Sequence, residues 1–301
     1  MFDFMLQQFS GLPVELETLS KGLKAYISEQ LRWCEDLDFS ANFPYLERGL
    51  PQSFFQQKVI TCNGNEYLTG PRYAGGDINK PFIDLVASSA PLTRRAAKAI
   101  MAVWHPLGAR SIRVLRIPNT ENAGKIDQCF YAGVSANVNN DINFRQSTVF
   151  LEKATSKQLN WCMETATRSY SDTYLHLPSL KDKVLPVEAD DLSDDIAEGN
   201  VYIIMLGDTR VGFIICEYGC RAFISGHWIT EEVVLPQFKG QRIAAMAQNE
   251  LYRIMDTTQA QPITLWGTIE KSNFPSIRAA ENAGRKNVME YVFMKEGDLH
   301  D

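Results

Sequence analysis

The sequence contains the stretch Val234-Leu235-Pro236-Gln237-Phe238-Lys239-Gly240-Gln241-Arg242-Ile243-Ala244 and, further along, the short stretch Asn273-Phe274-Pro275-Ser276. The first stretch predicts a strand that ends at a proline and leads, through a short basic loop, into a helix. The first backbone N–H groups of a helix lack partners within the helix, and the helix dipole favours negative charge there. The pattern therefore predicts a loop that can bind a phosphate group.

These stretches resemble the signature of the GNAT superfamily of acyl-CoA-dependent N-acyltransferases. That signature is Val-x-Pro, an aromatic residue, then Arg or Gln-x-x-Gly-x-Gly or Ala. Here Lys239 takes the basic first position, Ala244 takes the small last position, and Arg242 stands where the family prefers glycine. Glycine suits such a loop because the backbone must approach the phosphate and can need a positive φ. Either the side chain of Arg242 points away from the ligand, or the loop has a different local shape.

The resemblance implies a binding site for acetyl-CoA. The backbone N–H groups of the loop would face the pyrophosphate, and the two basic side chains of the loop would add charged contacts. In the family, the asparagine that opens the next helix binds the pantetheine arm; here that residue is Asn273, for which a simple helix cap is the alternative role. The strand before the loop pairs with the same arm through its backbone. The implied cofactor-binding residues are Val234, Lys239, Gly240, Gln241, Arg242, Ile243, Ala244, Asn273 and Ser276.

The resemblance also implies that an amine attacks the thioester directly, in a ternary complex. The backbone N–H of Val234 would donate to the thioester oxygen, where negative charge develops. The family often has a glutamate base at the position of Trp228 and a tyrosine acid at the position of Ala280, and this sequence has neither. The missing acid is not decisive, because a thiol of pKa about 8.5 leaves acceptably as the thiolate at neutral pH. Tyr252 and Tyr291 are alternative acids.

The base must then come from another side chain. Side chains alternate along a strand, so Glu232 shares a face with Trp228 and Val234. Glu232 is the first candidate for the base, followed by Glu231 and His227. A role of Glu232 in recognising the substrate is an equal alternative.

The C-terminal half predicts, element by element, the order β-α-α-β-β-β-α-β-α-β of the GNAT fold. The predicted strands are Ser147–Lys153, Val201–Met205, Val211–Glu217, His227–Leu235, Pro262–Ile269 and Val288–Lys295, and the predicted helices are Ser156–Tyr174, Pro186–Gly199, Gln241–Met255 and Phe274–Ala283.

The N-terminal half repeats part of this layout. It predicts a hairpin over Lys58–Leu68, strands over Phe82–Ser88 and Ser111–Ile117, and a helix over Leu92–Trp104. Matching turns and strands of the two halves are separated by roughly 145 residues, which favours an internal duplication. The expected fold class is therefore α/β (α+β), with a mixed central sheet flanked by helices in tandem GNAT-like domains. In this interpretation, residues 1–145 are expected to form a degenerate copy without the glycine loop, and residues 146–301 the acyltransferase domain.

Composition limits the function classes. The chain has 301 residues, of which 45% are apolar and 22% charged, and no stretch approaches the apolar length of a membrane span. The net charge of −6 disfavours a nucleic-acid groove. The six scattered cysteines indicate reduced thiols in a cytoplasmic protein, and their spacing predicts no metal site.

Three function classes remain from the sequence, and one of them is a plain protein-interaction module of two α/β domains. The first is an acetyl-CoA-dependent N-acetyltransferase, a monomer or homodimer that acts on a small-molecule or protein amine. The second is a GNAT-fold module without catalysis, which binds CoA or serves regulation or interaction. Its support is the loss of both usual acid and base positions, Trp228 and Ala280.

Overall fold

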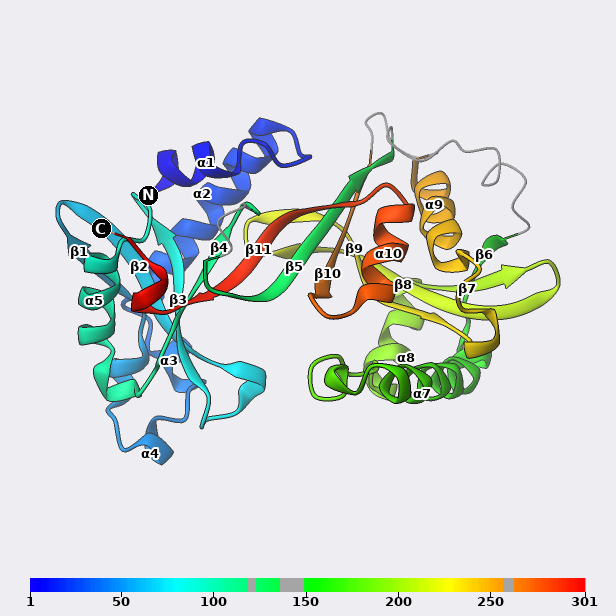
Figure 1. Cartoon of the computed structure of the whole chain (residues 1–301), viewed down its shortest axis with the longest axis horizontal. Helices are drawn as coiled ribbons and strands as arrows, with labels where there is room; N and C mark the ends of the chain where they lie inside the picture. The colour runs from blue at the N-terminus through cyan, green and yellow to red at the C-terminus, as the bar shows by residue number, and fades with distance from the viewer. Residues whose placement is uncertain (119–122, 136–148, 257–262, 301) are drawn as a thin grey trace. The chain divides into compact units, whose positions relative to one another are not determined.

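The computed structural model describes residues 1–118, 123–135, 149–256 and 263–300. The predicted strands that begin at Ser147 and Pro262 have their first residues outside these ranges. The expected domain boundary between residues 145 and 146 also lies outside them. The chain forms two compact units, drawn in Figure 1. Unit 1 comprises residues 1–127, 221–224 and 289–301, and unit 2 comprises residues 128–220 and 225–288.

Unit 2 is a mixed sheet in the strand order β5-β10-β9-β8-β7-β6. Most neighbours are antiparallel, and β9 and β10 are parallel because α9 connects them as a crossover. The predicted order of elements is confirmed. The bounds are β5 Lys125–Val134, β6 Val149–Lys153, α7 Leu159–His176, α8 Ala189–Glu198, β7 Val201–Leu206, β8 Thr209–Arg221, β9 Ile224–Val234, α9 Ile243–Asp256, β10 Thr264–Glu270 and α10 Phe274–Asn282.

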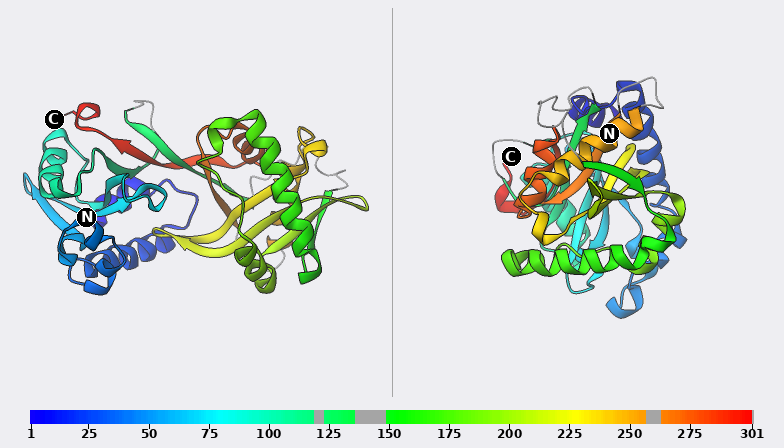
Figure 2. Two further views of the ribbon diagram at one scale, coloured as in Figure 1. Left: turned by 90° about the horizontal axis from the view of Figure 1, so that it is seen from below. Right: turned by 90° about the vertical axis from the view of Figure 1, so that its right-hand side faces the viewer.

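Helices cover both faces of the unit 2 sheet. Helices α7 and α8 lie on one face, and α9 and α10 lie on the other (Figure 2). The α9 face is closed by Ala247 and Leu251, which are fully buried against strand residues such as Ile214. These helix residues recur at the spacing of one helix face, as the sequence predicted. Each face of the sheet therefore has its own apolar core.

Strands β9 and β10 pair over a short segment only. The ladder joins His227–Ile229 to Leu265–Gly267, although β9 continues to Val234 and β10 to Glu270. Beyond the ladder the two strands have no recorded pairing in the described part of the chain. Because they run parallel, the loops that follow them leave the sheet at the same end. The ends of β9 and β10 that lie beyond their shared ladder, and the loops that follow the two strands, are thus at the same end of unit 2.

Unit 1 is a smaller mixed sheet in the order β1-β2-β3-β4-β11, with β3 and β4 parallel across the crossover helix α5. One core packs Ile100 and Trp104 of the α5 segment against strand residues such as Ile83. The bounds are α1 Phe2–Phe9, α2 Leu16–Arg32, α3 Leu37–Ala41, α4 Tyr45–Arg48, β1 Lys58–Cys62, β2 Asn65–Tyr73, β3 Pro81–Ser88, α5 Arg94–Val103, β4 Ile112–Arg116 and β11 Lys286–Met294.

Each unit contains a strand from the other half of the chain. Strand β5 pairs with β10 in unit 2, whereas β11 pairs with β4 in unit 1. The division of the structure therefore differs from the expected ranges 1–145 and 146–301, because strand pairing follows the sheets and not the order of the chain. The shared topology of the two units supports the internal duplication, which stays a prediction.

Among the described residues, no helix is long and apolar enough to cross a membrane.

Candidate cofactor and active site

The loop between β9 and α9 begins with a short 3-10 turn over Pro236–Phe238 and ends where α9 starts at Ile243. The first recorded bond of the helix backbone joins the N–H of Met246 to the carbonyl of Arg242 at 3.0 Å. The backbone N–H groups of residues 240–245 donate to no group within the described ranges. Among the described residues, the six successive donors before and at the start of α9 thus have no acceptor, as is usual for the first N–H groups of a helix.

Arg242 has a left-handed backbone with φ 60°, and Gly240 has φ 79°. A positive φ is uncommon for a residue with a side chain, and glycine adopts it without strain. The loop thus has, at residue 242, the backbone conformation for which glycine is favoured, although the side chain is arginine. The side chain of Arg242 is exposed and forms no ion pair with a described residue.

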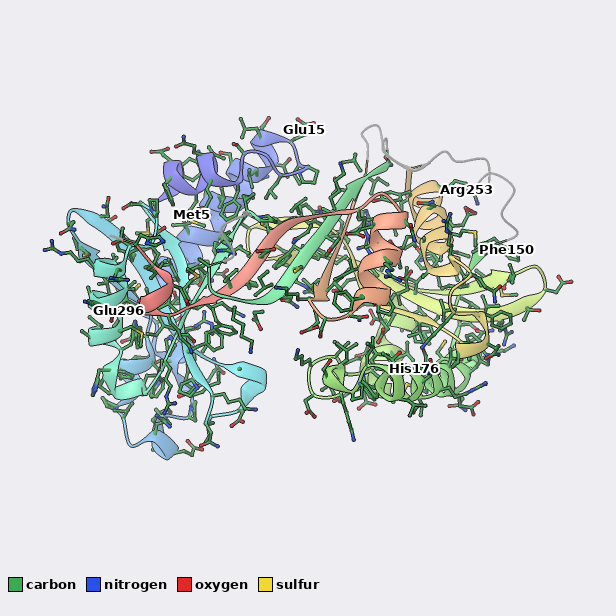
Figure 3. The ribbon with its side chains drawn as sticks, viewed as in Figure 1. Met5, Glu15, Phe150, His176, Arg253 and Glu296 are labelled. Atoms are coloured by element: carbon green, nitrogen blue, oxygen red, sulfur yellow. The ribbon has the colours of Figure 1, made fainter. Side chains whose placement is uncertain are left out.

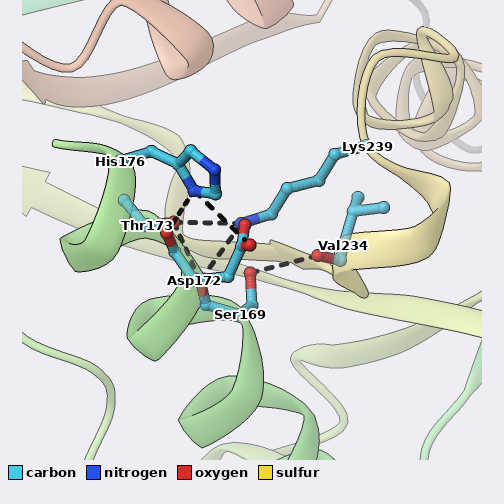
Figure 4. A network of polar contacts seen from close by, with 6 residues as sticks. All are labelled: Ser169, Asp172, Thr173, His176, Val234 and Lys239. Atoms are coloured by element: carbon cyan, nitrogen blue, oxygen red, sulfur yellow. Dashed lines mark hydrogen bonds and ion pairs between the residues drawn. The ribbon is translucent and has the colours of Figure 1, made fainter.

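Lys239 points to a different element than the sequence analysis expected. Its ammonium lies 2.8 Å from Asp172 Oδ2 and also donates to Ser169 O and Thr173 Oγ1, all on α7 (Figure 4). Gln241 turns back along the loop, where its side-chain amide donates to the carbonyl of Gln237 at 3.3 Å. These two side chains are therefore engaged by the protein itself.

The end of β9 presents its backbone to the side of β10. The N–H of Leu235 donates to the carbonyl of Val211 on β8 at 2.8 Å. Backbone N–H groups of neighbouring strand residues point to opposite edges, so the N–H of Val234 points away from β8. The β9–β10 ladder ends at Ile229, well before this residue. The carbonyl of Val234 accepts a bond from Ser169 Oγ at 3.0 Å, which fixes the strand end to α7 (Figure 4).

Glu232 lies in a buried polar chain that the sequence analysis did not anticipate. Gln248 Nε2 on α9 donates to Glu232 Oε2 at 2.8 Å, and Arg285 Nε donates to Gln248 Oε1 at 3.0 Å. Glu232 Oε1 is inaccessible to solvent and has no partner among the described residues. Burial raises the pKa of Glu232 to about 7, while Arg285 and Gln248 oppose the rise and Glu231 adds to it. A carboxyl with this pKa can accept or release a proton near neutral pH.

Arg285 occupies a slot that two glycines leave open. Only 3% of this residue is exposed. A Cβ on Gly267 would lie 2.6 Å from Arg285 Nη1, and a Cβ on Gly133 would lie 3.0 Å from Arg285 Cγ. A side chain at Gly267 would displace the end of the arginine, and one at Gly133 would press on Tyr252 Oη, 2.8 Å from its Cβ, as well as on the arginine. The glycines of β5 and β10 therefore make room for a buried positive charge near Glu232.

Glu231 faces the opposite side of β9 and is held from several directions. The hydroxyl of Tyr170 donates to both carboxylate oxygens at 3.0 and 2.8 Å, and the N–H groups of Glu232 and Val187 donate as well. Burial raises the pKa of Glu231, and these bonds oppose the rise. A carboxylate with every oxygen engaged orders its surroundings, since it ties β9 to α7 and to the segment before α8.

His227 lies seven residues before Val234, which is about 23 Å along a strand at 3.3 Å per residue. Burial lowers the pKa of His227, so the ring is neutral at neutral pH. Trp228 is buried and stacks on Trp266, with ring centroids 5.5 Å apart. The structure thus places His227 far from the candidate thioester site, whereas Glu231 and Glu232 are near its strand end.

At the end of β10, Asn273 caps α10: its side-chain oxygen accepts the N–H of Ser276 at 3.3 Å. Because β9 and β10 are parallel, Asn273 and the 240–245 loop belong to the same end of the sheet. Ala280 is fully buried and carries no acid. Tyr252 is no substitute, since it is buried and donates to the carbonyl of Gly133 at 2.7 Å, and Tyr291 belongs to the strand segment of unit 1.

Sequence reasoning missed the polar partners of the site. Gln248 carried a signal, since it is a polar residue beside Ala247 and Leu251 on the apolar face of α9. Arg285 and Asp172 carried none, because a charged residue at a helix or strand end is ordinarily solvated. Their roles depend on contacts between segments far apart in the sequence.

No protein-family model matches the chain, and no curated protein matches its sequence. Among solved structures, the chain is similar to an acetyltransferase of the GNAT family from Colwellia psychrerythraea. The identity is 13% and the TM-score 0.53, over 94% of this chain and 97% of that chain. It is also similar to a GCN5-related N-acetyltransferase from Sphaerobacter thermophilus, with 10% identity and a TM-score of 0.47, over 89% and 90% of the two chains.

At this identity the likeness concerns the fold, and the Colwellia structure carries it over nearly the whole length of both chains. The order of elements from β6 to β11 agrees with the predicted order β-α-α-β-β-β-α-β-α-β. The chain therefore has the fold of the GNAT-family acetyltransferases, and the resemblance predicted from the sequence is confirmed at the level of the fold.

Proposed function

We propose that this protein is an acetyl-CoA-dependent N-acetyltransferase whose cofactor binds to unit 2. The single observation that carries the proposal is the run of free backbone N–H groups over residues 240–245, at the N-terminus of α9. Free donors and the helix dipole both favour a pyrophosphate at such a place. The left-handed residues Gly240 and Arg242 suit a loop that wraps an anion.

The other proposed cofactor contacts belong to the same end of the sheet. The exposed guanidinium of Arg242 would add a charged contact to a phosphate. The backbone edge of β9 near Val234 and the side-chain amide of Asn273 would hold the pantetheine arm, with Gln241, Ile243, Ala244 and Ser276 close by. Acetyl-CoA supplies an activated acyl group as a thioester.

For the transfer itself, we propose two groups of the chain. The backbone N–H of Val234 points toward the unpaired edge of β9, where it can donate to an oxygen that gains negative charge. Glu232 is the proposed base, because its pKa is raised to about 7 and its Oε1 has no partner among the described residues. Its backbone lies two residues from Val234, or about 7 Å along the strand.

Glu231 and His227 are weaker candidates for the same task. Glu231 is engaged by Tyr170 and two backbone N–H groups, so protonating it would break an ordered network. His227 lies too far along the strand. With alanine at position 280, the thiolate of the product CoA would leave without a side-chain acid.

A second candidate function is a GNAT-fold module that binds CoA and does not catalyse. The observation that favours it is the burial of Glu232 Oε1, which is not open to solvent. The two candidates share the cofactor site and differ in turnover. They also share the proposal that unit 1 is a degenerate copy without a cofactor loop. The acceptor is an amine, carried by a small molecule or a protein.

Two measurements test the proposal in order. Calorimetry with CoA should show binding of one CoA per chain, and the absence of binding would contradict both candidates. A thiol-release assay with acetyl-CoA and a panel of amines should then show turnover. Turnover with any amine excludes the non-catalytic module, whereas CoA binding without release of thiol across the panel would favour it.

A further inference from the structure

The turn between β9 and α9 is attached to α7 at both of its ends. At the first end, Ser169 Oγ donates to the carbonyl of Val234 at 3.0 Å. At the second end, the side chain of Lys239 reaches back to the same turn of α7 (Figure 4). The free N–H groups of residues 240–245 begin with the next residue along the chain. We call the four side chains Ser169, Asp172, Thr173 and Lys239 the α7 clamp.

Every donor of the Lys239 ammonium is used within the clamp. A protonated lysine has three N–H donors. In the clamp they lie 2.8 Å from Asp172 Oδ2, 3.0 Å from Thr173 Oγ1 and 3.1 Å from Ser169 O. The hydroxyl of Thr173 donates its own hydrogen to Ser169 O, which leaves its lone pairs for the lysine. A phosphate could gain a direct bond from Lys239 only by breaking one of these bonds.

The electrostatics of the clamp agree with this geometry. The hydrogen bond and charge of Lys239 lower the pKa of Asp172 below its ordinary value, with a further contribution from His176. The side chains of Lys239 and Asp172 are only about a third exposed, at 34% and 29%. The pair is therefore screened less than an open surface pair.

Helix α7 is a firm support for the loop. It buries Cys162, Thr165, Ala166 and Ser169 against the sheet, and Cys162 and Ala166 belong to the core on this face. The backbone N–H groups of residues 240–245, in contrast, have no acceptor in the described part of the chain. A loop with free donors needs an external support if it is to keep one shape before the ligand arrives.

We propose that Lys239 is a positioning residue, which acts on CoA through the α7 clamp by holding the 240–245 loop in its anion-binding shape. The inference rests on the proposed function, since CoA is the ligand that the loop would bind. It differs from the role implied by the sequence pattern, in which Lys239 contacts the phosphate directly. It also gives Asp172, which lies on a different helix, a role in cofactor affinity.

The variants Lys239→Met, Asp172→Asn and their combination form a double-mutant cycle that tests this. Each single variant should weaken CoA binding in calorimetry by about 3- to 10-fold. The double variant should bind CoA no more weakly than whichever single variant has the lower affinity. Glu164→Gln is the control, because it removes the same charge from an exposed position of the same helix. Its CoA affinity should match that of the unmodified chain.

A direct phosphate contact predicts a different pattern. Asp172→Asn would then free the ammonium for the phosphate, so CoA would bind equally well or more tightly, while Lys239→Met alone would weaken binding. That result would overturn the proposal. Equal affinity of all variants and the unmodified chain would overturn it as well.

Amide hydrogen exchange without CoA separates this inference from the proposed function. The N–H groups of Phe238 and Met246 flank the free donors and are bonded to Leu235 O and Arg242 O at 2.9 and 3.0 Å. Their exchange should be faster in Lys239→Met and in Asp172→Asn than in the unmodified chain or in Glu164→Gln. Unchanged exchange in both variants contradicts the clamp. If the unmodified chain binds no CoA, the proposed function fails, and the exchange rates still decide whether the clamp holds the loop.

Discussion

The two crossover helices of the molecule, α5 in unit 1 and α9 in unit 2, begin differently although each follows a parallel strand and a turn with a proline. At α5, the N–H of Arg94 donates to the carbonyl of His300 at 3.0 Å, and the N–H of Ala96 donates to Thr93 Oγ1 at 3.2 Å. At α9, the N–H groups of residues 240–245 have no acceptor in the described part of the chain. The protein thus supplies acceptors for N–H groups at the start of α5, whereas the described residues supply none at the start of α9.

The C-terminal segment is what closes the start of α5. Besides the bond to His300, Glu296, labelled in Figure 3, pairs with Lys98 of α5 at 3.2 Å. Leu299 is buried in the same core as α5. A helix N-terminus after a parallel strand is therefore not by itself an anion site. The donors must also be unpaired, and the backbone must turn so that they converge.

The strands that precede these two helices, β3 and β9, also differ in the residues at their C-terminal ends. Strand β9 carries Glu231 and Glu232 near its end, whereas the last residues of β3 are Val86, Ala87 and Ser88. Both candidate groups for chemistry, the free donors and the raised carboxyl, therefore occur in unit 2.

The largest effect should come from Glu232. Glu232→Gln keeps the bond to Gln248 and removes the base, so kcat should fall by about 100- to 10,000-fold. CoA affinity measured by calorimetry should stay within about twofold, because the proposed CoA contacts on β9 are backbone groups. A kcat close to that of the unmodified chain would show that another group takes the proton.

The pH dependence of stability should test the raised pKa of Glu232 directly. The pKa of Glu232 is raised to about 7 in the folded chain from an ordinary value near 4.5, so folding favours the protonated form. This contribution is fully present below about pH 4.5 and is lost as pH rises through about 7. Across that window the unmodified chain should lose about 2–3 kcal/mol of unfolding free energy relative to Glu232→Gln. Urea denaturation at several pH values measures this, and parallel curves would contradict the shift.

Arginines at the two helix starts offer a matched pair of variants. Arg242→Ala should weaken CoA binding by about 5-fold, since an exposed charged contact contributes about 1 kcal/mol. Arg95→Ala removes the same charge from the start of α5 and should leave the affinity unchanged. Calorimetry at two salt concentrations should also show a smaller salt dependence for Arg242→Ala alone. Equal losses for both variants would point to a general charge effect.

The smallest effect concerns the closed helix start. Thr93→Ala removes the hydroxyl that accepts the N–H of Ala96, so the unfolding free energy should fall by about 1 kcal/mol. CoA affinity and stoichiometry should not change, because the bond from Arg94 to His300 remains. A second bound CoA in this variant would show that unit 1 keeps a cofactor site.

Local elements followed the sequence closely. The predicted helix Gln241–Met255 is α9, Ile243–Asp256, and the predicted helix Phe274–Ala283 is α10, with Asn273 as its cap. These helices were predictable because periodicity and caps are properties of neighbouring residues. Strand β5 and the first helices were not anticipated. The placement of β5 in unit 2 and of β11 in unit 1 could not be anticipated either, because strand partners are chosen by packing across the whole chain.

The features of the candidate site also fall into those that the sequence predicted and those that it did not. The loop and the absence of the two usual acid and base positions were visible in the sequence. The left-handed backbone of Arg242 was not, because local preference favours glycine there and only the surrounding loop imposes this conformation. The partners of Glu232 lie on α9 and before β11, so no local pattern could reveal its raised pKa.

The order of elements, the position of the loop before α9 and the resemblance to one fold could all be predicted from the sequence. These follow from periodicity, turn residues and a short motif, which act over a few residues. The tertiary structure was needed to show which helix start lacks acceptors among the described residues, that α7 holds Lys239, and that one carboxylate oxygen of Glu232 is buried near the charge of Arg285. Each of these depends on which distant groups pair or lose water, and that is settled when the sheets and helices pack together.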